Sequence, residues 1–178
     1  MYRNALRTLA KDEELFRLFY YDCPPYEGKE TNPIDRSNID FAAQPKHQAR
    51  TRFLREIKEM DYVALRLGTA KKRGWTLHDS YIRRTISGQP PRPPQANDVF
   101  LSLEQKGVDM RIGIDVATLS LKHIVDRIVL ISGDTDMIPA MKLARREGVQ
   151  VVLVELSSPI HNELDEDADL VRVITPNP

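Results

Sequence analysis

The chain has 178 residues, the length of one ordinary domain, and its 41% hydrophobic and 29% charged residues are typical of a soluble globular protein. Its 26 basic side chains balance 26 acidic ones, so net charge gives no indication of a nucleic-acid or membrane partner. The single cysteine excludes an internal disulfide and a cysteine-based zinc site. Because neither a membrane span nor the apolar core of a signal peptide is present, we expect a cytoplasmic protein with no membrane partner.

The first part of the chain alternates between helical and extended patterns. Prolines 24 and 25 end the first extended stretch, since the residue before a proline leaves the helical region and proline donates no hydrogen bond. Residues 2–19 are compatible either with one continuous helix or with a helix followed by a strand, and the pattern favours the second. The pattern predicts a helix over residues 2–10, a strand over 15–21, a polar loop over 27–43, an amphipathic helix over 44–60 and a strand over 62–67.

The middle of the chain is basic and rich in proline. Residues 69–75 predict a basic loop that carries the only tryptophan, Trp75. Residues 86–97 contain four prolines and predict a linker or flap over the domain rather than a domain boundary. In the next predicted helix, over 105–123, Asp115 shares a stripe with apolar residues. A carboxylate on a buried face is costly unless it is paired, so Asp115 is either a structural hydrogen-bond acceptor or part of a site.

Residues 128–156 predict a strand, an acidic turn, a helix and a second strand. The apolar run at 128–131 favours a strand covered on both faces, and Asp136 is the expected N-cap of a helix over 137–147. Joined to a strand over 149–156, these segments form a right-handed βαβ unit, and a short acidic helix and a last strand at 170–174 follow. The count of such units predicts a three-layer α/β fold with a mainly parallel sheet, whose sites lie at the carboxyl ends of strands.

Several carboxylates lie near the carboxyl end of a predicted strand, where open α/β sheets place their functional sites. Asp134 and Asp136 follow a buried strand, and Asp109 lies near the start of the preceding helix. Ionised carboxylates within a few ångströms repel one another, so such a cluster is stable only around a cation, and oxygen ligands suit Mg²⁺ or Mn²⁺ rather than zinc. Each acid alone also has a structural explanation, as a helix cap, a turn brace or an early-helix acid favoured by the dipole, and spacing leaves the two interpretations evenly balanced.

Two long stretches of the chain read KGVDMRIGIDVATLS and DRIVLISGDTDMIPAMKLARREGVQVVLV. These stretches resemble the NYN domain, a PIN-like nuclease family that includes the LabA/DUF88 proteins. YYDCPP is similar to the end of the family's second strand and ADLVRVI to its last strand, so the resemblance covers nearly the whole chain. It implies one PIN-like domain over residues 1–178, an α/β/α sandwich, and metal-dependent cleavage of RNA by a carboxylate cluster.

Carried over by motif, the resemblance implies that Asp109 in KGVD and Asp134 in SGDTD are metal ligands. Asp136 is the next candidate ligand, and Asp115 is a supporting acid. Lys106 is a candidate phosphate contact. The basic loop is a candidate nucleic-acid contact in which Trp75 stacks on a base, and its alternative is a solvated turn with a packed tryptophan. The loop's basic residues are Lys71, Lys72 and Arg73.

The family normally opens with a strand that carries Asp-Gly-x-Asn, whose aspartate is a core ligand, whereas residues 1–10 here resemble the helix that follows it. A site short of one carboxylate should hold metal less well. Three functions therefore stay open. The first is a Mg²⁺- or Mn²⁺-dependent endoribonuclease that uses Asp109, Asp134 and Asp136. The second is a catalytically impaired RNA-binding or regulatory module, and the third is an interaction subunit whose open sheet pairs with another chain, as in a homo-oligomer.

Overall fold

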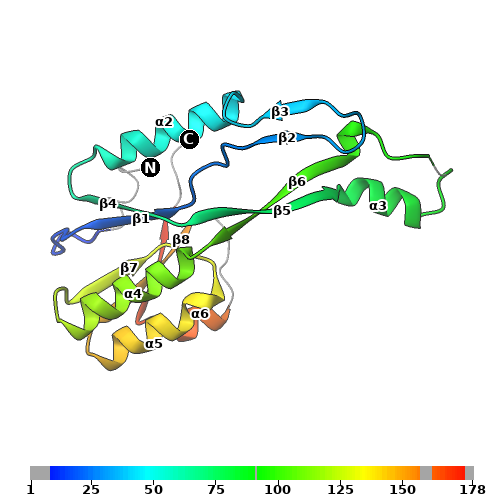
Figure 1. Cartoon of the computed structure of the whole chain (residues 1–178). Helices are drawn as coiled ribbons and strands as arrows, with labels where there is room; N and C mark the ends of the chain where they lie inside the picture. Colours follow the sequence, from blue (N-terminus) through cyan, green and yellow to red (C-terminus); the bar gives the residue numbers. More distant parts are fainter. Residues whose placement is uncertain (1–8, 91, 157–161, 175–178) are drawn as a thin grey trace. The chain divides into compact units, whose positions relative to one another are not determined.

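The computed structural model describes residues 9–90, 92–156 and 162–174 (Figure 1). The chain divides into two compact units. Unit 1 contains Met1–Tyr21, Asp61–Arg66 and Gly107–Pro178, and unit 2 contains Asp22–Met60 and Leu67–Lys106. Most of the helix expected over residues 2–10 lies outside the described residues. None of the helices in the described ranges has the length and apolar character that crossing a membrane requires.

Unit 1 contains a three-stranded parallel sheet in the order β7-β8-β9. Its strands are β7 (Arg127–Leu130), β8 (Gln150–Leu156) and β9 (Leu170–Ile174), as the apolar runs predicted. In the central strand β8, Val152 and Leu153 are completely inaccessible to solvent although their side chains point to opposite faces. Continuous burial on both faces explains why β8 is apolar at consecutive positions rather than at alternate ones.

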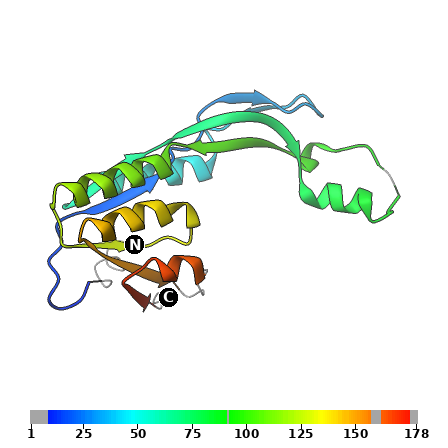
Figure 2. The same ribbon diagram turned by 90° about the horizontal axis from the view of Figure 1, so that it is seen from below.

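Helices pack against this sheet and against each other. They are α4 (Val108–Leu121), α5 (Ile138–Arg146) and α6 (Asn162–Glu166). Helix α5 packs on β8 and lies beside α4, as the green and gold helices of Figure 2 show. The predicted βαβ unit β7-α5-β8 is therefore confirmed. The main core of the unit joins helices and sheet through Val116, Met141, Ala144, Leu153 and Leu164.

A second pair of strands, β1 (Leu18–Asp22) and β4 (Val63–Leu67), belongs to unit 1 except for the last residue of each strand. This pair confirms the two strands predicted early in the chain. The pair is parallel, since Leu18 N donates to Tyr62 O and Gly68 N donates to Asp22 O, both at 2.8 Å. Among the described strands, none joins this pair to β7-β8-β9. The fold is thus mixed α/β, with several small sheets in place of one continuous sheet.

Unit 2 begins with a short hairpin, β2 (Lys29–Thr31) and β3 (Asn38–Asp40), followed by α2 (Pro45–Lys58). The helix was predicted, but the expectation of a plain loop over residues 27–43 is wrong. The hairpin is held by buried Asn32, whose Nδ2 donates to Ala96 O at 3.2 Å and whose Oδ1 accepts from Ile34 N at 2.9 Å. Because a polar side chain rather than an apolar stripe fixes this turn, the hydrophobic pattern did not indicate it.

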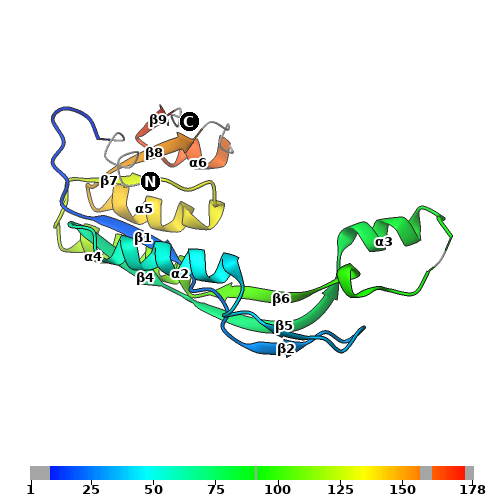
Figure 3. The same cartoon turned by 90° about the horizontal axis from the view of Figure 1, so that it is seen from above.

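A long antiparallel ribbon follows, made of β5 (Thr69–Leu77) and β6 (Val99–Lys106), and Figure 3 shows the two strands side by side. The predicted basic loop at 69–75 is therefore a strand. A bulge between Lys72 and Gly74 interrupts the alternation of side chains, which is why the sequence does not read as extended. The helix predicted from residue 105 begins only at Val108, because β6 runs to Lys106 and Gly107 turns the chain with φ of 77°.

Between the two ribbon strands lie α3 (Asp79–Ile86), the proline-rich segment and the short 3₁₀ helix η1 (Ala96–Asp98). Arg92 donates to both carboxylate oxygens of Asp98 at 2.5 and 2.8 Å, and its guanidinium lies 5.2 Å from the Tyr81 ring centroid. Tyr81 Oη donates to Arg92 O at 2.7 Å. These contacts fold the segment back onto α3, and no boundary between the two units falls within it.

Candidate functional site

The acidic turn after β7 is organised by Asp134. Its Oδ1 accepts from Asp136 N at 3.0 Å, and its backbone oxygen accepts from Met137 N at 3.2 Å. Asp134 is thus the N-cap of η2 (Thr135–Met137), the 3₁₀ turn that precedes α5. The prediction that Asp136 caps the helix is wrong, because α5 begins at Ile138 and the cap belongs to the earlier 3₁₀ turn. Both carboxylates are exposed to solvent.

Asp109 lies in the first turn of α4 and is also exposed. Helix α4 packs against η2 as well as against α5, so the segment that carries Asp109 contacts the segment next to Asp134. These acids were expected at one edge of the sheet, and the structure shows the contact between α4 and η2 but no closer grouping of the acids among the described residues. In the described part of the chain, however, no group of three or more His, Cys, Asp or Glu side chains is placed to hold one metal ion.

Asp115 has a structural role. Its Oδ2 accepts from Tyr21 Oη and from Arg66 Nε, both at 2.9 Å, which ties the middle of α4 to β1 and β4. Burial, and secondly the hydrogen bond to the Asp115 carboxylate, raises the pKa of Tyr21 well above its ordinary value. Of the two alternatives left open by the sequence, the hydrogen-bond acceptor is therefore the one that the contacts describe.

The basic residues of the ribbon divide between its two faces. Lys72 Nζ contacts Glu30 Oε1 of β2 at 2.8 Å, and this contact is the main reason why the pKa of Glu30 is lowered. Arg73 and Lys106 instead both pair with Glu104 on the other face of the ribbon. Lys106 is the main reason why the pKa of Glu104 is lowered, and Arg73 adds to the effect. The five residues predicted to contact nucleic acid therefore do not form one surface.

Trp75 pairs across the ribbon with buried Leu101, and Lys72 pairs with Leu103. Because Leu101 and Leu103 are two residues apart on β6, their side chains share a face, and Trp75 therefore lies on the same face as Lys72. The tryptophan is only half-exposed, as the packed alternative suggested. Lys71 points to the opposite face, where its cross-strand partner is Glu104. Lys71 and Lys72 diverge because successive side chains of a strand point to opposite faces of the sheet.

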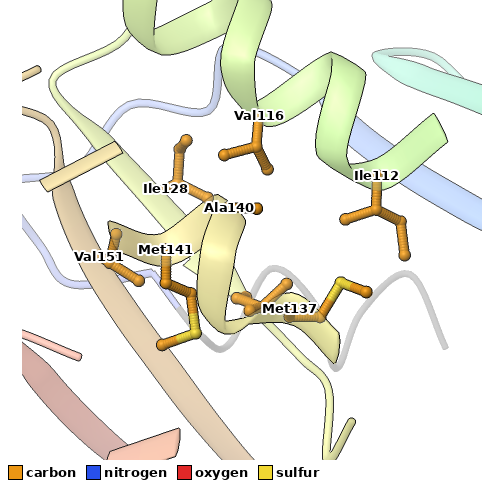
Figure 4. A pocket seen from close by; sticks show the side chains of 8 residues that line it. Ile112, Val116, Ile128, Met137, Ala140, Met141 and Val151 are labelled. Carbon is orange, nitrogen blue, oxygen red and sulfur yellow. The ribbon is translucent and has the colours of Figure 1, made fainter. Parts of the chain in front are cut away.

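A small cavity in unit 1 lies between α4, α5, β7 and β8, and Figure 4 shows the side chains around it. All of them are aliphatic or methionine side chains, so the cavity offers neither a polar anchor for a substrate nor a group that could transfer a proton. We interpret it as a packing gap in the core. Its lining consists of Ile112, Val116, Ile128, Leu130, Met137, Ala140, Met141 and Val151.

Comparison with known proteins adds a family. A family model described as the NYN domain matches residues 34–172. A similar solved structure is that of a protein of unknown function, VPA0982 from Vibrio parahaemolyticus RIMD 2210633, with 18% identity, a TM-score of 0.42, and coverage of 75% of this chain and 63% of that one. This chain thus spans less than two thirds of that protein's length. No curated protein matches the chain.

Proposed function

The chain belongs to the NYN domain family of the PIN-like nuclease superfamily, and from this premise we propose that it is a divalent-metal-dependent endoribonuclease. The proposed centre for phosphodiester hydrolysis is the set of exposed carboxylates Asp109, Asp134 and Asp136. One observation carries the proposal. The helix that presents Asp109 packs against the 3₁₀ turn that Asp134 caps, so two acidic segments far apart in the sequence meet within one unit.

The donor chemistry of these residues fits a hard cation, since carboxylate oxygens are the ligands that Mg²⁺ and Mn²⁺ prefer. Few protein ligands are available to such a cation, since no three His, Cys, Asp or Glu side chains of the described residues are placed to hold one metal ion. Mg²⁺ commonly uses only one or two carboxylates together with waters and substrate phosphates, so the proposed ligands suit an ion that arrives with RNA. Such an ion would activate water and neutralise charge on the phosphodiester.

The protein's own contribution is orientation. The hydrogen bond from Asp136 N fixes one oxygen of Asp134 and leaves the carboxylate at the surface. Asp115 is engaged by Arg66 and Tyr21, so we assign it a supporting role, in which it positions α4 against β1 and β4. Of the nucleic-acid contacts expected from the sequence, Lys71, Arg73 and Lys106 lie on one face of the ribbon and are the contacts proposed here. Lys72, which pairs with Glu30, and Trp75 lie on the other face and are not part of the proposed contact surface.

A second candidate function is RNA binding without cleavage. It is favoured by the small number of carboxylates that gather in the described residues and by the structural pairing of Asp115. A regulatory module of this kind would hold RNA in a salt-dependent manner and release it unchanged. The two candidates differ only in turnover, so one assay separates them.

We would incubate the purified chain with end-labelled single-stranded RNA in Mg²⁺, in Mn²⁺ and in EDTA. The test variant is Asp134→Asn, because asparagine keeps an oxygen that accepts from Asp136 N while it removes the charge. The matched control is Asp61→Asn, an exposed acid of the same unit outside the acidic edge. We expect metal-dependent cutting by the wild type and Asp61→Asn, and a loss of at least about tenfold in Asp134→Asn. Cutting in EDTA, or full activity in Asp134→Asn, would refute the nuclease proposal.

Further expectations belong to this proposal. They are a three-layer α/β/α arrangement, a single domain over residues 1–178, membership of the LabA/DUF88 subgroup, a cytoplasmic location and a possible homo-oligomer. The oligomer is checked by sedimentation of the intact chain at micromolar concentration. A single monomeric species would argue against the interaction-subunit alternative.

A further inference from the structure

The β5-β6 ribbon has one face that is turned toward the β2-β3 hairpin and one that is not. Contacts fix this division, because Lys72 reaches Glu30 of β2 on the first face, and Arg73 reaches Glu104 on the second. In the antiparallel register, Thr76 pairs with Phe100, Gly74 with Ser102 and Lys71 with Glu104. Directly opposed residues share a face, and residues two apart on one strand do so as well. We call the second face the Phe100 face, and it carries Lys71, Arg73, Thr76, Phe100, Ser102, Glu104 and Lys106.

Cations dominate one end of the Phe100 face. Lys71, Arg73 and Lys106 are all exposed, and Glu104 is the acid that pairs with the last two. Three positive charges therefore stand against one negative charge within a few residues. The segment as a whole shows the same excess, since residues 67–106 contain seven Lys and Arg against three Asp and Glu. A neutral chain thus presents a local basic surface.

An exposed aromatic group lies at the other end of the same face. The Phe100 side chain is 39% exposed, and its ring centroid is 4.7 Å from that of His78, which is also exposed. Thr76, Ser102 and the missing side chain of Gly74 separate this pair from the cations, so the middle of the face is flat and polar. Trp75, the stacking residue expected from the sequence, lies on the opposite face across from buried Leu101.

We infer that the Phe100 face binds single-stranded RNA, with Lys71, Arg73 and Lys106 along the phosphates and a base stacked on Phe100. This inference rests on the proposed function, because it names the surface that receives the RNA. A basic surface that follows the backbone, combined with an exposed aromatic ring, is the usual composition of single-strand sites. Over the eight residues of β6 the face is about 27 Å long at 3.4 Å per residue, which leaves room for several nucleotides.

The composition of the face favours RNA over a protein partner. A stable protein interface has a desolvated apolar centre from which charged residues are depleted, whereas Phe100 is the single large apolar side chain on this face. The opposite face offers a useful contrast, because it carries Trp75, Leu101 and Leu103 and is partly covered. The two faces therefore differ in chemistry although they belong to the same two strands.

The ribbon supplies its own matched controls. Lys71 and Lys72 are adjacent and exposed but point to opposite faces, and Phe100 and Leu103 are 39% and 40% exposed on opposite faces of β6. We would measure the anisotropy of a fluorescently labelled U12 RNA with the intact chain in EDTA, over a series of salt concentrations. EDTA separates binding from cleavage. The variants are Lys71→Ala, Lys72→Ala, Phe100→Ala, Leu103→Ala and Phe100→Trp, each checked for folding by circular dichroism.

For the Phe100 face to be the site, Phe100→Ala must weaken binding about 5- to 150-fold, the loss expected for one stacked base, while Leu103→Ala changes it less than about twofold. Phe100→Trp must restore binding, which a purely structural role would not predict. Lys71→Ala must reduce the slope of log K against log salt by about 0.7, the value for one single-strand phosphate, and Lys72→Ala must leave the slope unchanged.

Equal effects of the members of either pair would overturn the inference, and so would a change in oligomeric state without a change in RNA binding, which would mark a protein interface. These results are separable from those on the nuclease proposal. RNA bound through the Phe100 face but left uncut in Mg²⁺ or Mn²⁺ would support the inference and refute the nuclease. Metal-dependent cutting of RNA to which neither Phe100 nor Lys71 contributes would support the nuclease proposal and overturn the inference about the Phe100 face. A wild-type chain that binds no U12 at low salt would overturn the inference outright.

Discussion

The Glu13 carboxylate accepts hydrogen bonds from two arginines and one backbone amide, and removing its charge should cost measurable stability. Arg172 of β9 donates to it through Nη1 at 2.8 Å and Nη2 at 2.6 Å, Arg127 at the start of β7 donates through Nη1, and Ala10 N donates at 2.6 Å. The side chain of Glu13 is 9% exposed. These hydrogen bonds, above all those from Arg172, lower the pKa of Glu13 from 4.5 to about 2.

The magnitude of the effect follows from that pKa. A fall from 4.5 to about 2 corresponds to roughly 3 kcal/mol between the two protonation states. The Arg127 and Arg172 side chains are 30% and 22% exposed, so water screens part of the attraction. We therefore expect Glu13→Gln to lower the free energy of unfolding by about 2 kcal/mol at pH 7. The assay is urea denaturation followed by circular dichroism, with Glu14→Gln as the control, because Glu14 is an exposed neighbour of equal charge.

The pH dependence gives the sharper test. A folded pKa below the unfolded value stabilises the protein fully above about pH 5, and the contribution is lost as pH falls toward 2. The difference between wild type and Glu13→Gln should thus be constant from pH 7 to pH 5 and fall to about half or less by pH 3. A difference no larger than that of Glu14→Gln at pH 7, or one that stays constant down to pH 3, would refute this account of Glu13.

Two further predictions concern contacts in each unit. Asp115→Asn should lower the pKa of Tyr21 but leave it above its ordinary value, because burial, the larger cause of the shift, remains. Titration of ¹³C-labelled tyrosine by NMR measures this pKa. An unchanged pKa of Tyr21 in the variant would contradict the hydrogen bond to Asp115. Arg92→Ala should free the segment at residues 86–97 from α3, because it removes the pair with Asp98 and the contact over Tyr81. Faster limited proteolysis within 86–97 is the expected readout, and cleavage at the wild-type rate would show that Arg92 does not hold the segment.

Strands that contain a continuous apolar run were the easiest elements to predict. The runs at residues 128–130 of β7 and 151–154 of β8 are apolar without interruption, and the helix between them indicated that the two strands pair in parallel. The ribbon was missed because a bulge and three consecutive basic residues mask its alternation, and the β2-β3 hairpin because buried Asn32 fixes it. Both failures have the same origin, since pattern analysis detects apolar periodicity and these elements are specified by polar contacts.

The candidate site was predictable in its residues but not in its contacts. The carboxyl-end rule directed attention to Asp134, and the structure shows that residue as an N-cap at the surface. The sequence did not indicate that Arg66 and Tyr21 donate hydrogen bonds to Asp115, because both residues belong to strands that are distant in the chain. Nor was it expected that Lys71 and Lys72 point to opposite faces, because residues 69–75 were predicted to be a loop and the alternation of their side chains follows only from the pairing of β5 with β6.

Net charge was the least informative property of the sequence, and its division between the units explains why. Unit 2 contains 14 Lys and Arg against 10 Asp and Glu, whereas unit 1 contains 12 against 16, so two opposite excesses cancel. A polyanion is attracted by the first excess and repelled by the second. An enzyme that acts on RNA through exposed carboxylates must offset that repulsion, either with cations of its own or with bound metal. The salt slope of the Lys71 variant measures the first contribution, and metal dependence measured with Asp134→Asn reports on the second, so the two can be assigned independently.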